Sequence, residues 1–219
     1  MDGAREHVAR ASPRCFVVVH AVSKSHNVGT IARCATAFDV EEVWIVGSDK
    51  YRTFGSHGAA DHVRWMHAPT LEEAKSKLKA LHGACLCGVE IVDEAKPIQE
   101  QPFVGPTAFL LGNEGEGLAE KEKSLCDQFV YIPQYGKGTA SLNVAVAASI
   151  VLHHFAVWAG YQEAARQQHK YLVGPKPMRR GKRGVVCGPP EEIAQRRKER
   201  DARRLLEETT EQEPYMELF

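Results

Sequence analysis

The sequence has no hydrophobic run long enough to cross a membrane. Its most apolar stretch, residues 142–159, is interrupted by Asn143 and by two histidines, whereas a transmembrane helix needs about 20 predominantly apolar residues. The first residues lack the apolar core of a signal peptide, and Asp2 and Glu6 argue against an organelle transit peptide. We therefore expect a soluble protein with no membrane partner, located in the cytoplasm, with the nucleus or an organelle as alternatives.

Metal-binding and disulfide patterns are also missing. The chain has 6 cysteines and 10 histidines but no C-x-x-C pair and no H-E-x-x-H sequence, and these are spacings typical of zinc sites. Cys85 and Cys87 lie two residues apart in an apolar run, as same-face residues of a strand would. Because 219 residues of which 43% are hydrophobic can form a core without disulfides, we expect buried free thiols and no metal site.

The formal net charge is +0, but the charges are distributed unevenly along the chain. Residues 176–204 contain 11 Lys and Arg against 4 Asp and Glu, whereas residues 205–219 contain 5 Glu and no basic residue. A basic segment beside a nearly neutral domain favours a polyanionic partner. On composition alone, a solvated charged tail explains the same pattern. The candidate residues for contact with such a partner are Lys176, Arg179, Arg180, Lys182 and Arg183.

The pattern of apolar residues predicts an α/β fold. Apolar runs rich in β-branched residues predict buried strands at residues 15–21, 42–47, 62–66, 84–90, 107–112 and 128–133. Helical patterns lie at residues 28–38, 71–81, 117–126 and 142–162. Strands that alternate with helices predict a mostly parallel sheet with helices on both faces.

The composition changes after Tyr161, where Lys, Arg, Gly and Pro replace the apolar periodicity. We therefore divide the chain into an N-terminal segment of residues 1–14, a core domain of residues 15–162, and an extension of residues 163–219 that is first basic and then acidic.

Three segments carry residues that suggest a binding site, and the first is residues 26–38, directly after the first predicted strand. Asn27 is a candidate helix N-cap, and Gly29 permits a close approach by another backbone or a ligand. Arg33 is turned away from the apolar face of the predicted helix. A lone arginine in such a place is usually a solvated charge, but open α/β sheets bind ligands at the carboxyl ends of their strands. Arg33 is therefore a candidate site residue.

The second segment, residues 109–118, leads a strand directly into the sequence G-N-E-G-E-G-L. Its glycines allow tight turns and close backbone approach. Their spacing is not the dinucleotide fingerprint G-x-G-x-x-G, and the carboxylates of Glu114 and Glu116 would repel a phosphate. The loop is compatible with a cationic or zwitterionic ligand such as a sulfonium, and the alternative is a simple turn between a strand and a helix.

The third segment, residues 131–148, contains Y-I-P, a glycine-containing loop, and then S-L-N-V at the start of a long apolar helix. Ser141 can cap this helix, and Asn143 then falls in its first turn. A buried asparagine needs hydrogen-bond partners, so Asn143 either braces a loop or binds a ligand.

Taken in order, these segments resemble the SpoU (TrmH-like) branch of the SPOUT methyltransferase superfamily. The motifs are N-x-G-x-x-x-R-x-A at 27–35, G-N-E-G-x-G-L at 112–118 and I-P…S-L-N-V at 132–144. The resemblance covers roughly residues 15–160, a usual size for one domain. It implies a deep trefoil knot in the C-terminal half of the sheet and S-adenosyl-L-methionine as the cofactor. It also implies a homodimer whose active sites are assembled across the subunit interface.

The resemblance also implies roles for individual residues. Arg33 corresponds to the catalytic arginine of the family, and the other catalytic candidates are Asn27, Glu114, Ser141 and Asn143. The cofactor-binding candidates are Leu111, Gly112, Gly117, Ile132 and Leu142. Asp39 and Gln134 depart from the residues common in the family, and the loop 134–140 is a residue longer than in many members.

These features predict S-adenosylmethionine-dependent 2′-O-ribose methylation of RNA, with transfer RNA as the expected substrate and ribosomal RNA as the alternative. Arg33 either grips the phosphate beside the target ribose or acts as the base, although an arginine side chain stays protonated in water. A non-catalytic knotted RNA-binding protein is a competing interpretation, against which the complete motif set argues. A nucleotide-dependent oxidoreductase is another, and the missing G-x-G-x-x-G argues against it.

Overall fold

The computed structural model of the protein describes residues 12–20, 22, 24–48, 53–113 and 115–175. The chain divides into two units, Met1–Gly174 and Pro175–Phe219, and the second lies almost wholly outside the described residues. The predicted charged extension and its candidate RNA-binding residues Lys176, Arg179, Arg180, Lys182 and Arg183 therefore lie outside the part of the chain that the structure describes.

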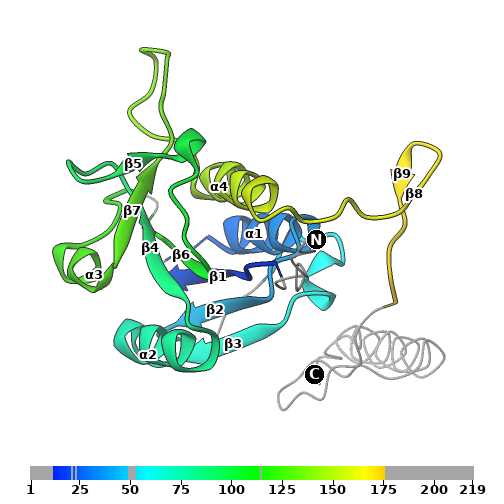
Figure 1. Ribbon diagram of the computed structural model, residues 1–219, viewed down its shortest axis with the longest axis horizontal. Helices are drawn as coiled ribbons and strands as arrows, with labels where there is room; N and C mark the ends of the chain where they lie inside the picture. The colour runs from blue at the N-terminus through cyan, green and yellow to red at the C-terminus, as the bar shows by residue number, and fades with distance from the viewer. Residues whose placement is uncertain (1–11, 21, 23, 49–52, 114, 176–219) are drawn as a thin grey trace, which may run out of the picture. The chain divides into compact units, whose positions relative to one another are not determined.

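A parallel sheet forms the centre of the first unit (Figure 1). Its strands are β1 (Cys15–His20), β2 (Glu42–Val46), β3 (Trp65–Ala68), β4 (Cys85–Val89), β5 (Lys96–Pro97), β6 (Thr107–Leu111) and β7 (Gln128–Tyr131). They lie in the order β3-β2-β1-β6-β4-β7-β5, and each neighbouring pair is parallel. The predicted α/β fold with a mostly parallel sheet is confirmed.

Helices cover both faces of this sheet. The helices are α1 (Ser25–Ala37), α2 (Leu71–His82), α3 (Glu120–Leu125) and α4 (Val144–Trp158), with short 3-10 turns η1 (Ala59–Asp61) and η2 (Ile98–Glu100). Helices α1 and α4 pack together on one face, and α2 with the shorter α3 lies on the other (Figure 1). A small hairpin of β8 (Arg166–Gln167) and β9 (Lys170–Tyr171) follows α4.

Alternate residues of the central strands supply the two hydrophobic cores. In β1, Val17 and Val19 pack in the core beneath α1 and α4, whereas Phe16 and Val18 pack in the core beneath α2. All four side chains are buried. Strands of a parallel sheet are covered on both faces, and for this reason they appear in the sequence as continuous apolar runs.

Several element limits differ from the predicted ones because of local backbone geometry. Strand β3 begins at Trp65 rather than at residue 62, because residues 59–61 form η1 and the indole of Trp65 donates a hydrogen bond to the Ala60 carbonyl. Helix α4 ends at Trp158 rather than at residue 162, and Gly160 follows with a φ of 66°. The two-residue strands β5, β8 and β9 are too short to leave a periodic pattern in the sequence.

The expectation of free thiols is confirmed for the cysteines that the structure describes. Cys15 and Cys87 are buried in the core, whereas the others are half-buried. Burial raises the pKa of both buried thiols well above the usual value, because the apolar surroundings disfavour a thiolate. These two cysteines therefore act as core residues rather than as nucleophiles.

A carboxylate is buried at the amino-terminal edge of the sheet. Glu42, the first residue of β2, is 1% exposed. Its carboxylate accepts a hydrogen bond from Nε1 of Trp44 at 2.9 Å and lies 3.3 Å from Nε of Arg64. A buried carboxylate needs such partners, so Glu42, Trp44 and Arg64 form one polar cluster at this edge of the sheet.

Gly29 allows the segment after β2 to pack directly on helix α1. A Cβ atom at this position would lie 2.0 Å from the carbonyl oxygen of Phe54 and 2.7 Å from its carbonyl carbon. The ring of Phe54 in turn packs edge-on against His26, with ring centroids 4.7 Å apart. The close backbone approach that the sequence predicted at Gly29 is therefore made by another part of the chain.

We predict that Gly29→Ala lowers the free energy of unfolding by about 1–3 kcal/mol, because the added methyl group meets backbone atoms that cannot rotate away. Urea unfolding monitored by tryptophan fluorescence measures the change. Gly105→Ala is the matched control, since nothing lies within 4 Å of the added carbon there, and its effect should stay within about 0.5 kcal/mol. Equal stability of the two variants would contradict the packing described here.

Candidate functional site

The carboxyl ends of four neighbouring strands lie at the same level of the sheet. Leu111 at the end of β6 pairs with Val19 of β1 and with Val89 of β4, and Val89 pairs with Val130 of β7. The chain leaves β1 for α1 on one face and leaves β6 for α3 on the other. Open α/β sheets bind ligands in the crevice that such divergent connections create.

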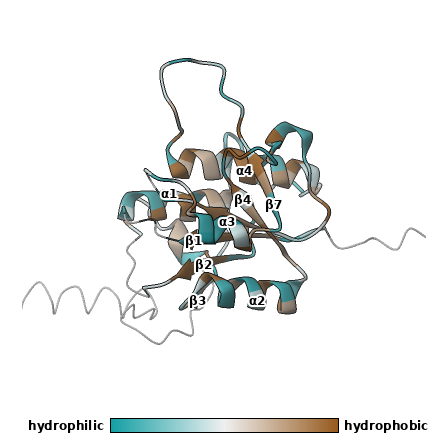
Figure 2. Cartoon of the chain, turned by 90° about the vertical axis from the view of Figure 1, so that its left-hand side faces the viewer, coloured by the Kyte–Doolittle hydropathy of each residue, from teal (hydrophilic) through white to brown (hydrophobic). Residues whose placement is uncertain are grey.

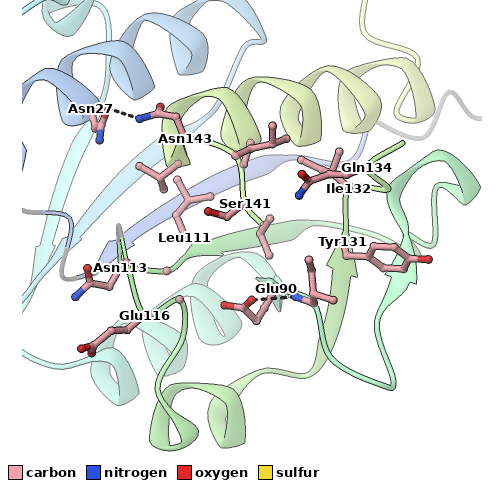
Figure 3. A pocket seen from close by; sticks show the side chains of 18 of the residues that line it. Asn27, Glu90, Leu111, Asn113, Glu116, Tyr131, Ile132, Gln134, Ser141 and Asn143 are labelled. Carbon is pink, nitrogen blue, oxygen red and sulfur yellow. Dashed lines mark hydrogen bonds between the residues drawn. The ribbon is translucent and has the colours of Figure 1, made fainter. Parts of the chain in front are cut away.

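A pocket of about 440 Å³ occupies this crevice. Its volume is in the range of small-molecule sites. It is formed by the segments that follow β1, β4, β6 and β7 and by the start of α4 (Figure 3). The lining residues include Lys24, Asn27, Val89, Glu90, Ile91, Leu111, Gly112, Asn113, Gly115, Glu116, Gly117, Tyr131, Ile132, Gln134, Ser141, Leu142, Asn143, Val144 and Ala147.

Two asparagines connect the segment after β1 with the start of α4. The Asn143 side-chain amide donates a hydrogen bond to Oδ1 of Asn27 at 3.2 Å (Figure 3). Oδ1 of Asn143 accepts from the backbone N–H of Ala145 at 3.0 Å and of Val146 at 3.4 Å. Asn143 therefore caps helix α4 with its oxygen and holds Asn27, which is 9% exposed, with its nitrogen.

Glu90 holds the glycine-rich loop in place at the end of β4. Its Oε2 accepts a hydrogen bond from the backbone N–H of Leu118 at 2.9 Å, and its Oε1 accepts from its neighbour Ile91 at 3.0 Å. Gly117 has a φ of 70°, and a Cβ atom there would lie 2.2 Å from Oε2 of Glu90. Only glycine fits both the backbone conformation and the space at position 117.

The loop itself closes as a very short antiparallel turn. The backbone N–H of Asn113 donates to the Gly117 carbonyl at 3.0 Å, and the N–H of Gly117 donates to the Asn113 carbonyl at 3.3 Å. Leu118 then enters the core at 2% exposure. This geometry explains why α3 begins at Glu120 and not at the predicted residue 117.

Carboxylates make this side of the pocket acidic. Glu90 and Glu116 line the pocket on the side of the glycine-rich loop, whereas Asn27 and Asn143 lie on the opposite side (Figure 3). Lys24 contributes a positive charge among the lining residues. An anionic ligand is disfavoured beside Glu90 and Glu116, and a cationic group is favoured there.

Most of the predicted site residues are brought together in this pocket. The predicted catalytic residues that line it are Asn27, Ser141 and Asn143, and all five predicted cofactor-binding residues line it: Leu111, Gly112, Gly117, Ile132 and Leu142. Glu114 lies outside the described residues. The roles assigned to these residues stay predictions.

Arg33 is not among the residues that line the pocket. It lies on α1, six positions after Asn27, with an exposed side chain. Within the single chain, the arginine that the sequence analysis placed at the site is therefore separate from the pocket that holds the other candidates.

Two predicted helix caps are wrong. Helix α1 begins at Ser25, so Asn27 lies inside its first turn and Lys24 is the N-cap residue. Asn143, not Ser141, caps α4. At α4 the Asn143 oxygen makes the cap by accepting from the backbone N–H groups of Ala145 and Val146. At α1 the N-cap residue Lys24 makes no capping hydrogen bond with its side chain.

The sequence analysis did not select Glu90, which lines the pocket and binds the glycine-rich loop. Its position was nevertheless informative, since it directly follows strand β4. Ligands of open α/β sheets bind beyond the carboxyl ends of the parallel strands. Glu90 is the first residue after such a strand, whereas Arg33 lies further along, within helix α1.

The fold and the pocket define an α/β domain with a ligand site at the carboxyl edge of a parallel sheet. Residues 14–153 match the SpoU rRNA Methylase family. The chain therefore belongs to the SpoU methylase family, as the three motifs predict.

Similar proteins include a tRNA (guanosine(18)-2′-O)-methyltransferase of Escherichia coli K12, which is 33% identical over 152 residues. The match covers 68% of this chain and 65% of that relative, so the chain spans less than two thirds of its length. The enzyme of the same name from Thermus thermophilus is 32% identical over 176 residues, covering 78% of this chain and 84% of the relative. The SpoU methyltransferase AviRb from Streptomyces viridochromogenes superposes with a TM-score of 0.60 at 25% identity, covering 68% and 60% of the two chains.

Metal centres and membrane spans are two other kinds of feature that could define a function. Among the described residues, no three His, Cys, Asp or Glu side chains are grouped so that they could hold a metal ion. No described helix combines the length and the apolar character that crossing a bilayer requires.

We predict that Asn143→Ala lowers the free energy of unfolding by about 1–2 kcal/mol, because it removes the cap of α4 and the bond to Asn27. Asn143→Asp keeps an oxygen that caps the helix equally well, so it should retain most of the stability. Asn113→Ala, in the same pocket but away from the start of α4, is the control. Chemical denaturation distinguishes the variants, and equal losses in Asn143→Ala and Asn143→Asp would show that capping is unimportant.

Proposed function

We propose that the protein transfers a methyl group from S-adenosyl-L-methionine to the 2′-hydroxyl of a ribose in RNA. The observation that carries this proposal is the convergence of three family motifs on one pocket at the carboxyl edge of the sheet. Transfer RNA is the proposed substrate, supported by the names of the two relatives. Ribosomal RNA is the second candidate, supported by the description of the family.

The residues of the pocket fit this cofactor. Leu111, Ile132 and Leu142 provide apolar surface for an adenine ring. The close packing of Gly112 on Gly117, and of Gly117 on Glu90, fixes the loop that borders this surface. The carboxylates of Glu90 and Glu116 suit a positively charged sulfonium and would repel the phosphates of a dinucleotide. When bound, S-adenosyl-L-methionine supplies an activated methyl group for in-line displacement.

The protein must then position the ribose hydroxyl and stabilise the negative charge that develops on it. Arg33 is the residue that we assign to this task. The exposed guanidinium stays charged in water, which favours a grip on the phosphate beside the target ribose over a role as the base. We assign Asn27, Asn143 and Ser141 to holding the loops that shape the pocket, and Glu114 to bracing the first motif.

We infer that the active site is completed by a second subunit. Arg33 lies outside the pocket of its own chain, and we assign the arginine of the site to Arg33 of a second copy. Helix α4 carries exposed apolar side chains, with Val146 47% and Val157 59% exposed, and these provide a surface for self-association. A homodimer is the simplest closed arrangement that exchanges one residue reciprocally between two sites.

We also propose the trefoil knot and the division of the chain that the sequence analysis predicts. The loops that follow β6 and β7 both line the pocket, which is the place where the knotted segments of the family would hold the cofactor. Residues 15–162 then form the methyltransferase domain, preceded by the segment 1–14. Residues 163–219 form an extension that contacts RNA through the basic stretch.

We predict that the wild-type chain transfers tritium from labelled S-adenosyl-L-methionine to total transfer RNA, and that Arg33→Lys loses most of this turnover. Lysine retains the charge but lacks the planar pair of donors that grips a phosphate. Calorimetry should show unchanged cofactor binding, because Arg33 does not line the pocket. Near-normal turnover of Arg33→Lys would overturn the assignment of Arg33, and an inactive wild type would overturn the function.

Mixing of variants tests the shared site. Arg33→Lys and Gly117→Ala are each expected to be inactive, the second because its methyl group would meet Glu90. After the two are unfolded and refolded together, half of the dimers contain one intact site, so about a quarter of wild-type turnover should return. No recovery, with mixed dimers present, would show that Arg33 acts within its own chain.

We predict that cutting the chain after Gly174 weakens RNA binding and makes it less sensitive to salt, because the truncation removes the excess of basic residues in 176–204. Binding of labelled transfer RNA at several salt concentrations gives the slope of log affinity against log salt. Cofactor binding by the shortened chain is the control for folding. An unchanged slope would mean that the extension is a solvated tail.

A further inference from the structure

The segment between β7 and α4 projects from the body of the domain as a long loop (Figure 1). Figure 2 shows the same loop standing away from α4 in a perpendicular view. Almost all of its residues between 134 and 141 are exposed. No part of the proposed transfer reaction accounts for the exposed side chains of this loop.

The two ends of this loop are fixed at the pocket. Gln134 and Ser141 both line it. Near the second end, the Thr139 hydroxyl donates a hydrogen bond to the Ser141 carbonyl at 2.8 Å and accepts one from the Ser141 backbone N–H at 3.3 Å. The residues next to these two ends are therefore held beside the pocket.

Tyr135 directly follows Gln134 at the first end of the loop, beside the pocket, and 91% of its surface is exposed. Lys137 is two residues further on, and Gly136 and Gly138 flank it. Among the residues that the structure describes, neither Tyr135 nor Lys137 makes a side-chain hydrogen bond or an ion pair. A single exposed apolar residue is ordinary in proteins. An aromatic ring and a cation together, beside a ligand pocket, form the combination that binds single-stranded nucleic acid.

The charges around the pocket favour the approach of a polyanion from the side of this loop. Glu116 lies at the end of the pocket opposite to Gln134, from which the loop rises (Figure 3). A polyanion is repelled from the carboxylate end and attracted toward Lys137. RNA that reaches the pocket is therefore guided over the loop that carries Tyr135.

We propose that Tyr135 stacks on an unpaired nucleobase of the RNA substrate while Lys137 contacts an adjacent phosphate. This inference rests on the proposed function and deepens it, because it assigns the target to a single-stranded loop rather than a duplex. Bases can stack on an aromatic side chain only where they are splayed out of a helix. Tyr135 is thus a positioning residue of the substrate and touches neither the cofactor nor the reacting oxygen.

A second copy of the chain is a less suitable partner for this loop. A stable protein interface buries about 800 Å² on each side around an apolar centre. The loop of residues 134–140 offers one ring among glycines and polar side chains. Stacking on a flat base requires only that ring.

The test uses the full chain and a fluorescein-labelled single-stranded oligouridylate of about 12 nucleotides, a length within the usual site size. Tyr135→Ala should weaken binding about 5- to 100-fold, whereas Tyr135→Phe, which retains the ring, should stay within about 3-fold of the wild type. Val104→Ala is the matched control, because Val104 is 90% exposed on a different segment, and its binding should equal that of the wild type.

The salt dependence of RNA binding distinguishes a stacking contact by Tyr135 from a phosphate contact by Lys137. Tyr135→Ala should leave the slope of log affinity against log salt unchanged, whereas Lys137→Gln should reduce its magnitude by about 0.7, the value for one phosphate contact in a single strand. A duplex of the same length should bind Tyr135→Ala and wild type equally.

The proposal is overturned if Tyr135→Ala binds the oligouridylate as the wild type does. It is also overturned if this variant loses affinity for S-adenosyl-L-methionine or changes its sedimentation coefficient, since the ring would then serve the cofactor or a second subunit. Failure of the proposed function has a different signature, which is oligouridylate binding without any transfer of tritium to transfer RNA.

Discussion

The parallel pairing of β6 with β1 on one side and β4 on the other determines where every part of the pocket lies. This register brings the ends of the strands to one level, and each chain segment that leaves them begins at the same edge. The connections then diverge to opposite faces, so a crevice opens between them without any special loop structure. The opposite edge of the sheet holds the buried Glu42 with Trp44 and Arg64.

Within the pocket, backbone geometry and charge reinforce each other. Glu90 uses both carboxylate oxygens to bind backbone N–H groups, and one of them fixes the glycine-rich loop. The same loop places Glu116 beside the pocket. A site with this charge favours a cationic ligand, while the exposed Lys137 above it favours an anion. The carboxylates line the pocket whereas Lys137 does not, so these two preferences act at different places.

Much of the fold could be predicted because strands buried on both faces leave continuous apolar runs in the sequence. The ends of the elements could not, since they depend on local geometry such as the positive φ of Gly117 and the hydrogen bond between Asn27 and Asn143. The three motifs identified most of the residues that line the pocket. Glu90 could not be identified in this way, because it belongs to no sequence motif. The direction of the Arg33 side chain depends on how α1 packs on the domain. The spacing of residues along the helix does not reveal that Arg33 lies outside the pocket.

Asn143 has a consequence for how the molecule responds to a ligand. Its oxygen terminates α4 at the N–H of Val146, and the exposed side chain of Val146 belongs to the apolar surface of the same helix. A ligand that immobilises the loop holding Asn143 also suppresses fraying of the first turn of α4. Thermodynamic reciprocity then requires that anything packing on that turn tightens the pocket in return. The Asn143 side chain is thus the contact that the pocket and the first turn of α4 share.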